Sequence, residues 1–157
     1  LLYSCLELNK KYKNIELYIA GDGLLLNQLK EKYKRKNIHF LGKLNYDDIM
    51  SLYNDVDIFV NPSMYPEGLP TSILEAGIMK CAIVATDRGG TIEVINNKIY
   101  GNIVKENVES LTLNLEELFE NPKKMQEKKD NIHDRIIKEF TWEKTAKKLI
   151  KEIKNEK

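Results

Sequence analysis

Residues 61–77 read NPSMYPEGLPTSILEAG, and this stretch decides how the chain folds. The residues just before it, Asp57 to Val60, have the composition of a buried strand. Ser72 to Met79 show the apolar spacing of a helix, which leaves Asn61 to Pro70 as the loop between the two elements. Strand, loop and helix in this order build open α/β sheets, in which ligands bind at the carboxyl ends of the strands. The stretch therefore predicts both a fold class and the location of a ligand.

The same alternation of strand and helix continues on both sides of this stretch, and Asn45 is placed to cap one of the helices. Three helices close the chain, and in the last of them apolar residues from Trp142 to Ile153 recur every three or four positions, as in a surface helix lying on a core. We therefore expect an α/β fold with a doubly wound, Rossmann-like parallel sheet of about five to six strands and helices on both faces. Strands are predicted at residues 15–20, 38–41, 57–60, 82–86 and 100–104.

The composition limits the classes of function. The 157 residues are 42% apolar, which is enough for the core of one domain, so residues 1–157 are taken as a single domain. The 25 basic residues nearly cancel the 24 acidic ones, and no overall field favours nucleic acid as a partner. Cys5 and Cys81 lack metal-ligand spacing, and Cys81 lies in an apolar run that suits a small buried thiol. A reducing cytoplasm is the simplest compartment.

The two ends of the chain and its hydropathy add two expectations. No stretch approaches the roughly 20 apolar residues that span a bilayer, so no membrane anchor is predicted. The chain begins with Leu1 instead of methionine and opens on a helix, so we expect it to be a fragment that lacks an upstream segment.

Residues Gly68 to Ile73 have the composition of an anion-binding loop. Gly68 allows backbone to approach a ligand closely, and Pro70 stiffens the path into the helix. The amides of Thr71, Ser72 and Ile73 are expected to be free at the helix start. The positive end of the helix, equivalent to about half an elementary charge, attracts anions there. Such a site suits a diphosphate without many basic side chains.

Two glutamates flank this loop, and each has two interpretations. Glu67, beside Gly68, is placed to accept hydrogen bonds from sugar hydroxyls, although taken alone it also fits a solvated loop carboxylate. Glu75 lies about one turn inside the helix and leans toward the amino end, where it suits a diol such as ribose hydroxyls. The alternative for Glu75 is a capping box with Ser72, since a serine followed three residues later by a glutamate has that pattern.

Taken together, these segments resemble the family-four (group 1) retaining glycosyltransferases, in which two glutamates separated by seven residues, as Glu67 and Glu75 are here, mark the donor site. The resemblance runs over nearly the whole chain. It implies the C-terminal, donor-binding domain of a two-domain GT-B fold, whose N-terminal acceptor domain and first strand are absent here, and a metal-independent transfer. The other motifs are Ile19–Gly23, Phe40–Gly42, Asp57–Val60, Pro62–Ser63, Gly89–Glu93 and Phe140–Trp142.

By carry-over from the family, Glu67 contacts the donor sugar and is the candidate catalytic residue, Gly68 to Ser72 face the diphosphate, and Glu75 binds ribose. The glycine loop after the first strand borders the cleft, and backbone near Leu41 to Leu44 borders the base. The donor is then a UDP- or GDP-linked sugar, and neither a cofactor nor a metal is implied. The implied donor-binding residues are Gly21, Gly23, Leu41, Gly42, Lys43, Leu44, Glu67, Gly68, Leu69, Pro70, Thr71, Ser72 and Glu75.

The sequence departs from the family in two places. The family places an arginine and a lysine on the missing first strand, where they neutralise the leaving diphosphate, so this fragment alone is expected to be inactive. Arg88, beside Gly89-Gly90, is a candidate phosphate contact, or else an exposed loop arginine. The family also has a glycine near Lys80. Because Lys80 is an adequate cation for a helix end, we expect an altered turn there and no loss of function.

Three further signals are weaker. Asp55-Val56-Asp57 is similar to the paired-aspartate motif that holds a metal in another class of sugar transferases, but it precedes a buried strand and is interpreted as a turn. Gly21-Asp22-Gly23 lacks the third glycine of the dinucleotide fingerprint. His39 and His133 have no partners at metal-ligand or triad spacing and are interpreted as structural or solvated.

The leading hypothesis is that the intact protein transfers a hexose from a nucleotide sugar to a hydroxyl acceptor with retention, through an oxocarbenium-like transition state. Its partners are then the nucleotide sugar, the missing acceptor-binding domain, and an acceptor glycan or lipid-linked glycan. The alternatives are a nucleotide-sugar-binding module without turnover and a Rossmann-type dinucleotide-binding domain. The resemblance implies a cytoplasmic protein, with peripheral contact of the intact protein at the inner membrane face as one option.

Overall fold

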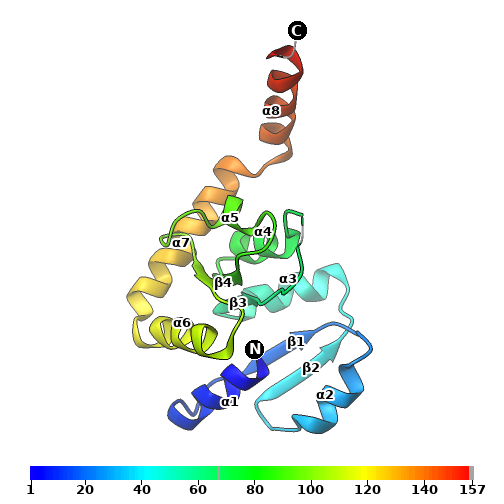
Figure 1. Cartoon of the computed structure of the whole chain (residues 1–157), viewed down its shortest axis with the longest axis vertical. Helices are drawn as coiled ribbons and strands as arrows, with labels where there is room; N and C mark the ends of the chain where they lie inside the picture. The colour runs from blue at the N-terminus through cyan, green and yellow to red at the C-terminus, as the bar shows by residue number, and fades with distance from the viewer. Residues whose placement is uncertain (67, 156–157) are drawn as a thin grey trace.

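A computed structural model describes residues 1–66 and 68–155 as an α/β protein (Figure 1). In this part of the chain every helix is too short or too polar to cross a bilayer. The strands are β1 Leu17–Ala20, β2 Ile38–Gly42, β3 Ile58–Asn61, β4 Ala82–Thr86 and β5 Asn102–Val104. The helices are α1 Leu2–Lys11, α2 Leu26–Lys32, α3 Tyr46–Asp55, α4 Thr71–Ile78, α5 Thr91–Val94, α6 Val108–Glu120, α7 Pro122–Glu139 and α8 Trp142–Asn155.

The described strands form two parallel sheets. In the smaller sheet β1 pairs with β2, and Leu17 lies opposite Ile38. In the larger sheet the order is β3-β4-β5, with Ile58 opposite Ala82. Because helices connect parallel strands throughout, the predicted doubly wound α/β class is confirmed. Within each sheet, the carboxyl ends of the strands lie at one edge.

The separation into two sheets differs from the single sheet that the sequence predicts. β1 and β3 do not pair with each other in the described part of the chain. The classic doubly wound order is 3-2-1-4-5-6. The pair β2-β1 and the triplet β3-β4-β5 fit positions 3-2 and 4-5-6 of this order. The two sheets are therefore separate at the position where that order places its first strand.

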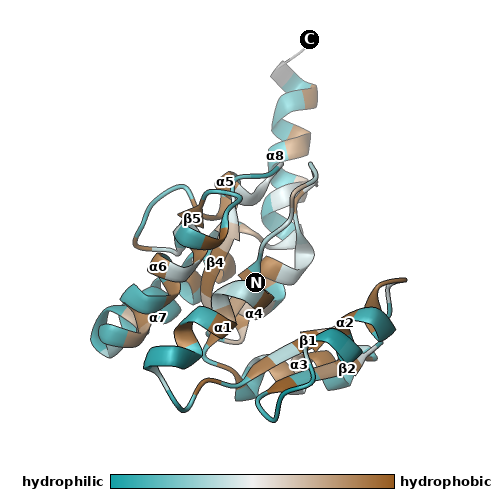
Figure 2. Ribbon diagram, turned by 60° about the horizontal axis from the view of Figure 1, so that its bottom comes forward, coloured by the Kyte–Doolittle hydropathy of each residue, from teal (hydrophilic) through white to brown (hydrophobic). Residues whose placement is uncertain are grey.

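β4 is the centre of the larger sheet and is buried along its whole length. Its side chains alternate between the two faces of the sheet. Ile83 and Ala85 belong to the core cluster formed with α4 and α7, whereas Ala82 and Val84 belong to the cluster formed with α1 and α6. Figure 2 shows the apolar strands of this sheet between helices. Two helical layers therefore fix the position of β4, and with it the loop at its carboxyl end.

The smaller sheet has a core of its own. Cys5 of α1 packs there with Tyr33 and Ile38, all of them less than one-tenth exposed. Ile15, just before β1, packs against this cluster and also against the cluster on the α1 and α6 face of β4. The segment from α1 to β1 therefore packs against both sheets.

Several side chains have the local role that the sequence predicts. The Asn45 side chain caps α3 by accepting a hydrogen bond from the Asp48 amide at 2.8 Å. Cys81 is fully buried, and its thiol donates to the Tyr53 carbonyl oxygen at 3.2 Å. Burial raises the pKa of the Cys81 thiol to about 11, so this thiol is a packing group.

The last helix contradicts its predicted packing. Trp142 is 90% exposed, and Leu149, Ile150 and Ile153 are each more than half exposed. The chain turns at Phe140 and α8 leaves the body of the domain (Figure 1). The prediction that this helix lies on a core is therefore wrong for the described residues. Amphipathic spacing shows that a helix has an apolar face, but it does not say which surface covers that face.

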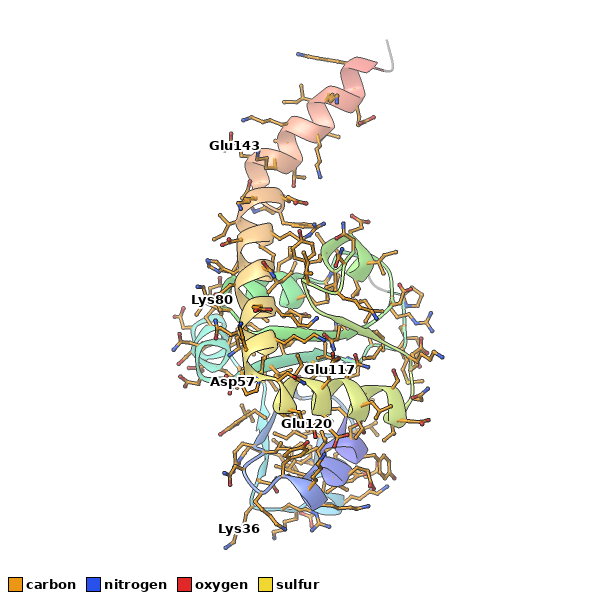
Figure 3. The ribbon with its side chains drawn as sticks, turned by 90° about the vertical axis from the view of Figure 1, so that its left-hand side faces the viewer. Lys36, Asp57, Lys80, Glu117, Glu120 and Glu143 are labelled. Atoms are coloured by element: carbon orange, nitrogen blue, oxygen red, sulfur yellow. The ribbon has the colours of Figure 1, made fainter. Side chains whose placement is uncertain are left out.

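The end of α4 has the geometry of a helix that stops on glycine, although Lys80 occupies the key position. Lys80 has φ 59°, and the Cys81 amide donates to the Ala76 carbonyl at 2.9 Å. This pattern is a Schellman turn, whose left-handed residue is usually glycine. The altered turn that the sequence suggested is therefore not found. The Lys80 ammonium lies 3.2 Å from the Asp130 carboxylate of α7. Figure 3 labels Lys80 next to this helix.

Replacing Lys80 by glycine should raise the free energy of unfolding by about 0.5–1 kcal/mol, measured by urea unfolding. Removing the Cβ relieves left-handed strain of about 1–2 kcal/mol, while the freedom of glycine in the unfolded chain and the lost exposed ion pair offset part of this gain. Lys80→Ala is the control, because it loses the ion pair but keeps the strain. Equal stability of the two variants would contradict this account.

Candidate functional site

The residues predicted for the site lie at the carboxyl ends of β1 to β4 or on the helix that follows β3. Gly21 and Gly23 follow β1, and Leu41 to Leu44 end and follow β2. Residue 61 ends β3, the rest of the predicted loop 61–70 leads into α4, and Arg88 follows β4. In open parallel sheets ligands bind at this edge. Glu67 lies outside the residues that the structure describes.

In the smaller sheet the structure brings two of the predicted segments together. The Gly21 amide donates to the Gly42 carbonyl at 2.7 Å, which holds the loop after β1 against the end of β2. Gly21 and Gly42 have φ values of 134° and 71°, which side chains with a Cβ rarely adopt. Leu41 and Lys43 are exposed beside this contact, and Leu44 is half-buried. This end of the smaller sheet therefore presents backbone together with the side chains of Leu41 and Lys43.

The start of α4 leaves two backbone amides available. Pro70 is buried at the N-cap position and has no side-chain donor or acceptor to offer. Among the described residues, the amides of Thr71 and Ser72 have no protein acceptor. The Ile73 amide donates to the Pro70 carbonyl at 3.1 Å, so the prediction that it is free is wrong. The reason is that a tight first turn satisfies one of the orphan amides of the helix internally.

Glu75 is not part of a capping box in the described residues. The helix begins at Thr71, so Ser72 lies inside it, and no hydrogen bond joins Ser72 to Glu75. The Glu75 side chain is half-buried and its charge is felt at Tyr53 of α3. Burial, and after it the negative charge of Glu75, raise the pKa of Tyr53 to about 12. Glu75 therefore lies on the side of α4 that faces α3, without a competing structural hydrogen bond.

The segment after β4 fastens the loop 61–70 at two points. The Thr86 hydroxyl donates to the Ser63 carbonyl at 2.5 Å, and the Gly90 amide donates to the Gly68 carbonyl at 3.0 Å. A Cβ on Gly90 would lie only 3.0 Å from the Gly68 carbonyl oxygen and from Leu69 Cα. A side chain at position 90 would therefore push these two backbones apart by a few tenths of an ångström. The contacts hold the loop at both of its ends.

Arg88 lies in the loop after β4 and is half-buried. Its guanidinium pairs with Glu106, in the turn after β5, and its side chain is 38% exposed. Arg88 thus lies at the expected edge of the sheet, with a carboxylate as its partner.

Other residues considered in the sequence have structural contacts. Asp57, before β3, lies at the opposite edge of the sheet from the predicted site and pairs with Lys129 of α7 at 2.6 Å (Figure 3). The His39 ring contacts Glu16 at 2.6 Å, and the His133 ring contacts the Ile78 carbonyl at 2.7 Å. These aspartate and histidine side chains therefore serve packing between elements.

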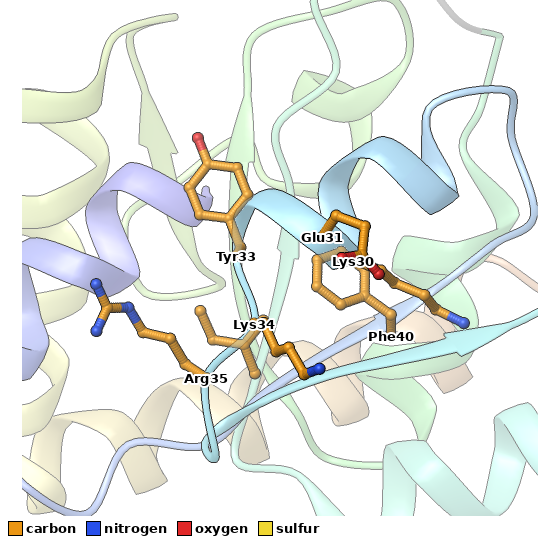
Figure 4. A pocket seen from close by; sticks show the side chains of 7 residues that line it. Lys30, Glu31, Tyr33, Lys34, Arg35 and Phe40 are labelled. Carbon is orange, nitrogen blue, oxygen red and sulfur yellow. The ribbon is translucent and has the colours of Figure 1, made fainter.

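A shallow pocket lies between the end of α2 and the start of β2 (Figure 4). Its walls include Lys30, Lys34 and Arg35 around the rings of Tyr33 and Phe40. Because it adjoins the amino end of β2, it is at the opposite end of that strand from Gly42. It includes none of the residues predicted for the site.

The sequence did not reveal Thr86 and Glu106, which contact the predicted site segments at Ser63 and Arg88. Thr86 and Glu106 carry no motif, and their roles arise from contacts between segments that are distant along the chain. The one signal available in advance was position, since both residues end or follow a strand at the ligand-binding edge.

Comparison with known proteins identifies related chains. The family described as "Glycosyl transferases group 1" matches residues 1–135. A relative from Campylobacter jejuni, named N,N'-diacetylbacillosaminyl-diphospho-undecaprenol alpha-1,3-N-acetylgalactosaminyltransferase, is 40% identical over 87 residues, which are 55% of this chain and 22% of the relative. This chain spans about a third of the length of the curated relatives that it matches over most of its own length.

Two solved structures are similar over nearly the whole chain. A glycosyltransferase from Rickettsia africae has a TM-score of 0.85 and 25% identity, and the match covers 99% of this chain and 43% of that one. Anabaena HepE, solved in complex with UDP, has a TM-score of 0.83 and 19% identity, with 99% and 44% covered. The second likeness is one of fold alone.

Replacing Thr86 by valine should lower the free energy of unfolding by about 1 kcal/mol, because the variant loses a buried hydrogen bond and leaves the Ser63 carbonyl without a donor. Hydrogen exchange should also quicken in residues 61–66 more than in the core strand β4. Thr86→Ser keeps the hydroxyl and should show slow exchange in the loop. If the valine and serine variants exchanged alike in residues 61–66, the hydroxyl would not fasten the loop.

Proposed function

The chain belongs to the group 1 glycosyltransferases, whose family model matches residues 1–135, and on that premise we propose that the intact protein is a retaining hexosyltransferase. It takes a hexose from a nucleoside diphosphate sugar and transfers it to a hydroxyl acceptor. The observation that carries the proposal is a helix start, directly after the loop that contains Glu67, at which the Thr71 and Ser72 amides have no acceptor among the residues that the structure describes.

The start of α4 supplies what a diphosphate needs from this domain. Two amides and the positive end of the helix attract negative oxygens, and no side chain in the described residues competes for these amides. Gly68, held by Gly90, brings backbone close to the ligand. A site of this kind binds the phosphates without a metal ion, and the proposal includes none.

The two glutamates take the parts of the donor that carry hydroxyls. A carboxylate repels phosphate and binds vicinal hydroxyls well, which suits Glu75 to the ribose beside the diphosphate. Glu67 precedes Gly68 and is assigned to the hexose. The exposed edge around Gly42 takes the base of UDP or GDP. HepE, which is similar to this chain in fold, was solved in complex with UDP, and this supports a nucleoside diphosphate as the ligand class proposed here.

The chemistry requires groups beyond this chain. As the bond to the anomeric carbon breaks, the hexose gains oxocarbenium character and the diphosphate gains negative charge. Loss of one preorganised partner of such a charge typically costs about 10² to 10³ in rate. We assign this role to an arginine and a lysine on a first strand between β1 and β3, contributed by the part of the protein that precedes α1. Residues 1–157 alone are then inactive.

The acceptor belongs to the other half of the protein in this proposal. The name of the Campylobacter jejuni relative describes transfer to a diphospho-undecaprenol-linked sugar. We extend this acceptor class, a glycan or lipid-linked glycan, to the present protein. A lipid-linked acceptor also requires peripheral contact between the intact protein and the inner face of the membrane. The acceptor binds in an N-terminal domain across the cleft from α4.

Titration of the intact protein with UDP, GDP and NAD tests the class of ligand. We expect one of the nucleoside diphosphates to bind in the micromolar range without added metal, and NAD to show no binding in isothermal titration calorimetry. Binding of NAD alone would favour the dinucleotide-binding alternative and would overturn the proposal.

Replacing Glu75 by alanine should weaken binding of the nucleoside diphosphate about 10- to 100-fold, since charge-assisted hydrogen bonds contribute about 1.5–3 kcal/mol. The matched control is Glu109→Ala, which removes an exposed glutamate from the first turn of α6 and should leave affinity unchanged. Thermal unfolding of each variant separates loss of affinity from loss of structure. An unchanged affinity in the Glu75 variant would remove the ribose assignment.

Replacing Glu67 by alanine should distinguish binding of the hexose from binding of the nucleoside diphosphate. If Glu67 contacts the hexose only, the variant binds the bare nucleoside diphosphate as the wild type does but binds the nucleotide sugar more weakly. Parallel titrations with both ligands measure this difference. Equal losses for both ligands would speak against assigning Glu67 to the hexose.

A further inference from the structure

The turn between β5 and α6 carries an ion pair that the proposed function does not use. Glu106 lies in this turn, and its carboxylate pairs with the guanidinium of Arg88. The Asn107 amide donates to the Lys105 carbonyl at 2.8 Å, and the Lys105 amide donates to the Ser110 hydroxyl at 3.0 Å. The backbone is therefore hydrogen-bonded on both sides of Glu106, and these bonds hold the backbone of Glu106 in place.

The base of Glu106 is anchored in the core. Asn107 caps α6 by accepting a hydrogen bond from the Ser110 amide at 2.7 Å. Leu111, Leu115 and Leu118 of this helix are each at most 5% exposed and pack against β4 and β5. A carboxylate on such a base can hold a more exposed loop in place.

A short path of contacts leads from Arg88 to the proposed diphosphate loop. The Arg88 carbonyl accepts a hydrogen bond from the Thr91 amide at 3.2 Å, which closes the turn through Gly89 and Gly90. The Gly90 amide then donates to the Gly68 carbonyl at 3.0 Å. The backbones at Gly68 and Gly90 lie so close that even a Cβ on Gly90 would touch them. A shift of the Arg88 turn is therefore passed on to Gly68.

We propose that Glu106 is a positioning residue of the donor site. By holding Arg88, it fixes the turn of Gly89 and Gly90, and through the bond from Gly90 to Gly68 it fixes the loop that leads into α4. This inference rests on the proposed function, because the loop that Glu106 positions is the proposed diphosphate loop. Glu106 itself touches no ligand in this arrangement.

A direct phosphate contact by Arg88 predicts the opposite effect of losing Glu106. If Arg88 bound the diphosphate, Glu106 would compete with that ligand for the guanidinium, and removing its charge would strengthen binding. If Arg88 instead holds the turn of Gly89 and Gly90 in place, removing the charge of Glu106 loosens the proposed diphosphate loop and weakens binding of the nucleoside diphosphate. The Arg88 and Glu106 side chains are only 38% and 30% exposed and are paired with each other. This favours a positioning role for Arg88 over a direct phosphate contact.

The test uses Glu106→Gln in the intact protein, together with the charge exchange Arg88→Glu with Glu106→Arg. The control is Asp130→Asn in α7, which removes the acidic partner of Lys80 after the carboxyl end of α4. Three quantities are measured for each variant: the affinity for UDP or GDP, whichever binds the wild type, by calorimetry; the exchange rate of the Gly90 amide without ligand; and the midpoint of thermal unfolding.

In Glu106→Gln we expect Gly90 exchange about fivefold faster and affinity about three- to tenfold weaker, which correspond to the loss of a modest ion pair. The unfolding midpoint should fall by less than about 4 °C. The exchanged pair should restore both values to within about twofold, and the Asp130 variant should match the wild type. Stronger binding by Glu106→Gln, unchanged Gly90 exchange, or no recovery in the exchanged pair would overturn the proposal. Failure of the wild type to bind a nucleoside diphosphate would refute the proposed function. The exchange rate of the Gly90 amide would then still test whether Glu106 holds the turn of Gly89 and Gly90 through Arg88.

Discussion

The start of α4 is the constraint on which the proposed site depends, because the Thr71 and Ser72 amides, which have no acceptor among the described residues, can bind a ligand only if this helix end is held in place. Pro70 occupies the N-cap position without a side chain that competes for them. Ile73 and Ala76 are fully buried and fix the rotation of the helix. On the same face α4 approaches α7 so closely that a Cβ at Gly77 would collide with the Ile136 side chain. Packing against α7 therefore holds α4 in place.

The sequence predicted the larger sheet well because its signals are local. β4 begins and ends at the predicted residues, since an unbroken apolar run of that length is typical of a strand buried on both faces. The cap at Asn45 and the burial of Cys81 likewise depend on immediate neighbours. The predicted site residues follow from the same logic, because the carboxyl ends of parallel strands share one edge. The assignment of these residues to the donor, Glu67 included, stays a prediction.

Other features of the structure did not follow from the sequence. The Ile73 amide is used inside the first turn, a detail of helix geometry that residue types do not encode. The partner of Arg88 comes from a turn 18 residues away, and no pattern in the sequence connects the two. The apolar face of α8 was assigned to a core from its spacing alone. At Lys80, composition suggested a changed turn, yet the buried ends of α4 and β4 impose the left-handed conformation on a lysine.

The division of the strands into two sheets has a consequence for the energetics of ligand recognition. Gly42 ends a strand of the smaller sheet, whereas α4 packs on the larger sheet, and α1 and Ile15 contact the cores of both. A nucleotide that reaches from one to the other acts as a cross-link, because its base and its phosphates each favour the same mutual orientation of the sheets. Occupancy and rigidity are then thermodynamically linked, so that whatever locks the sheets together also preorganises the cleft.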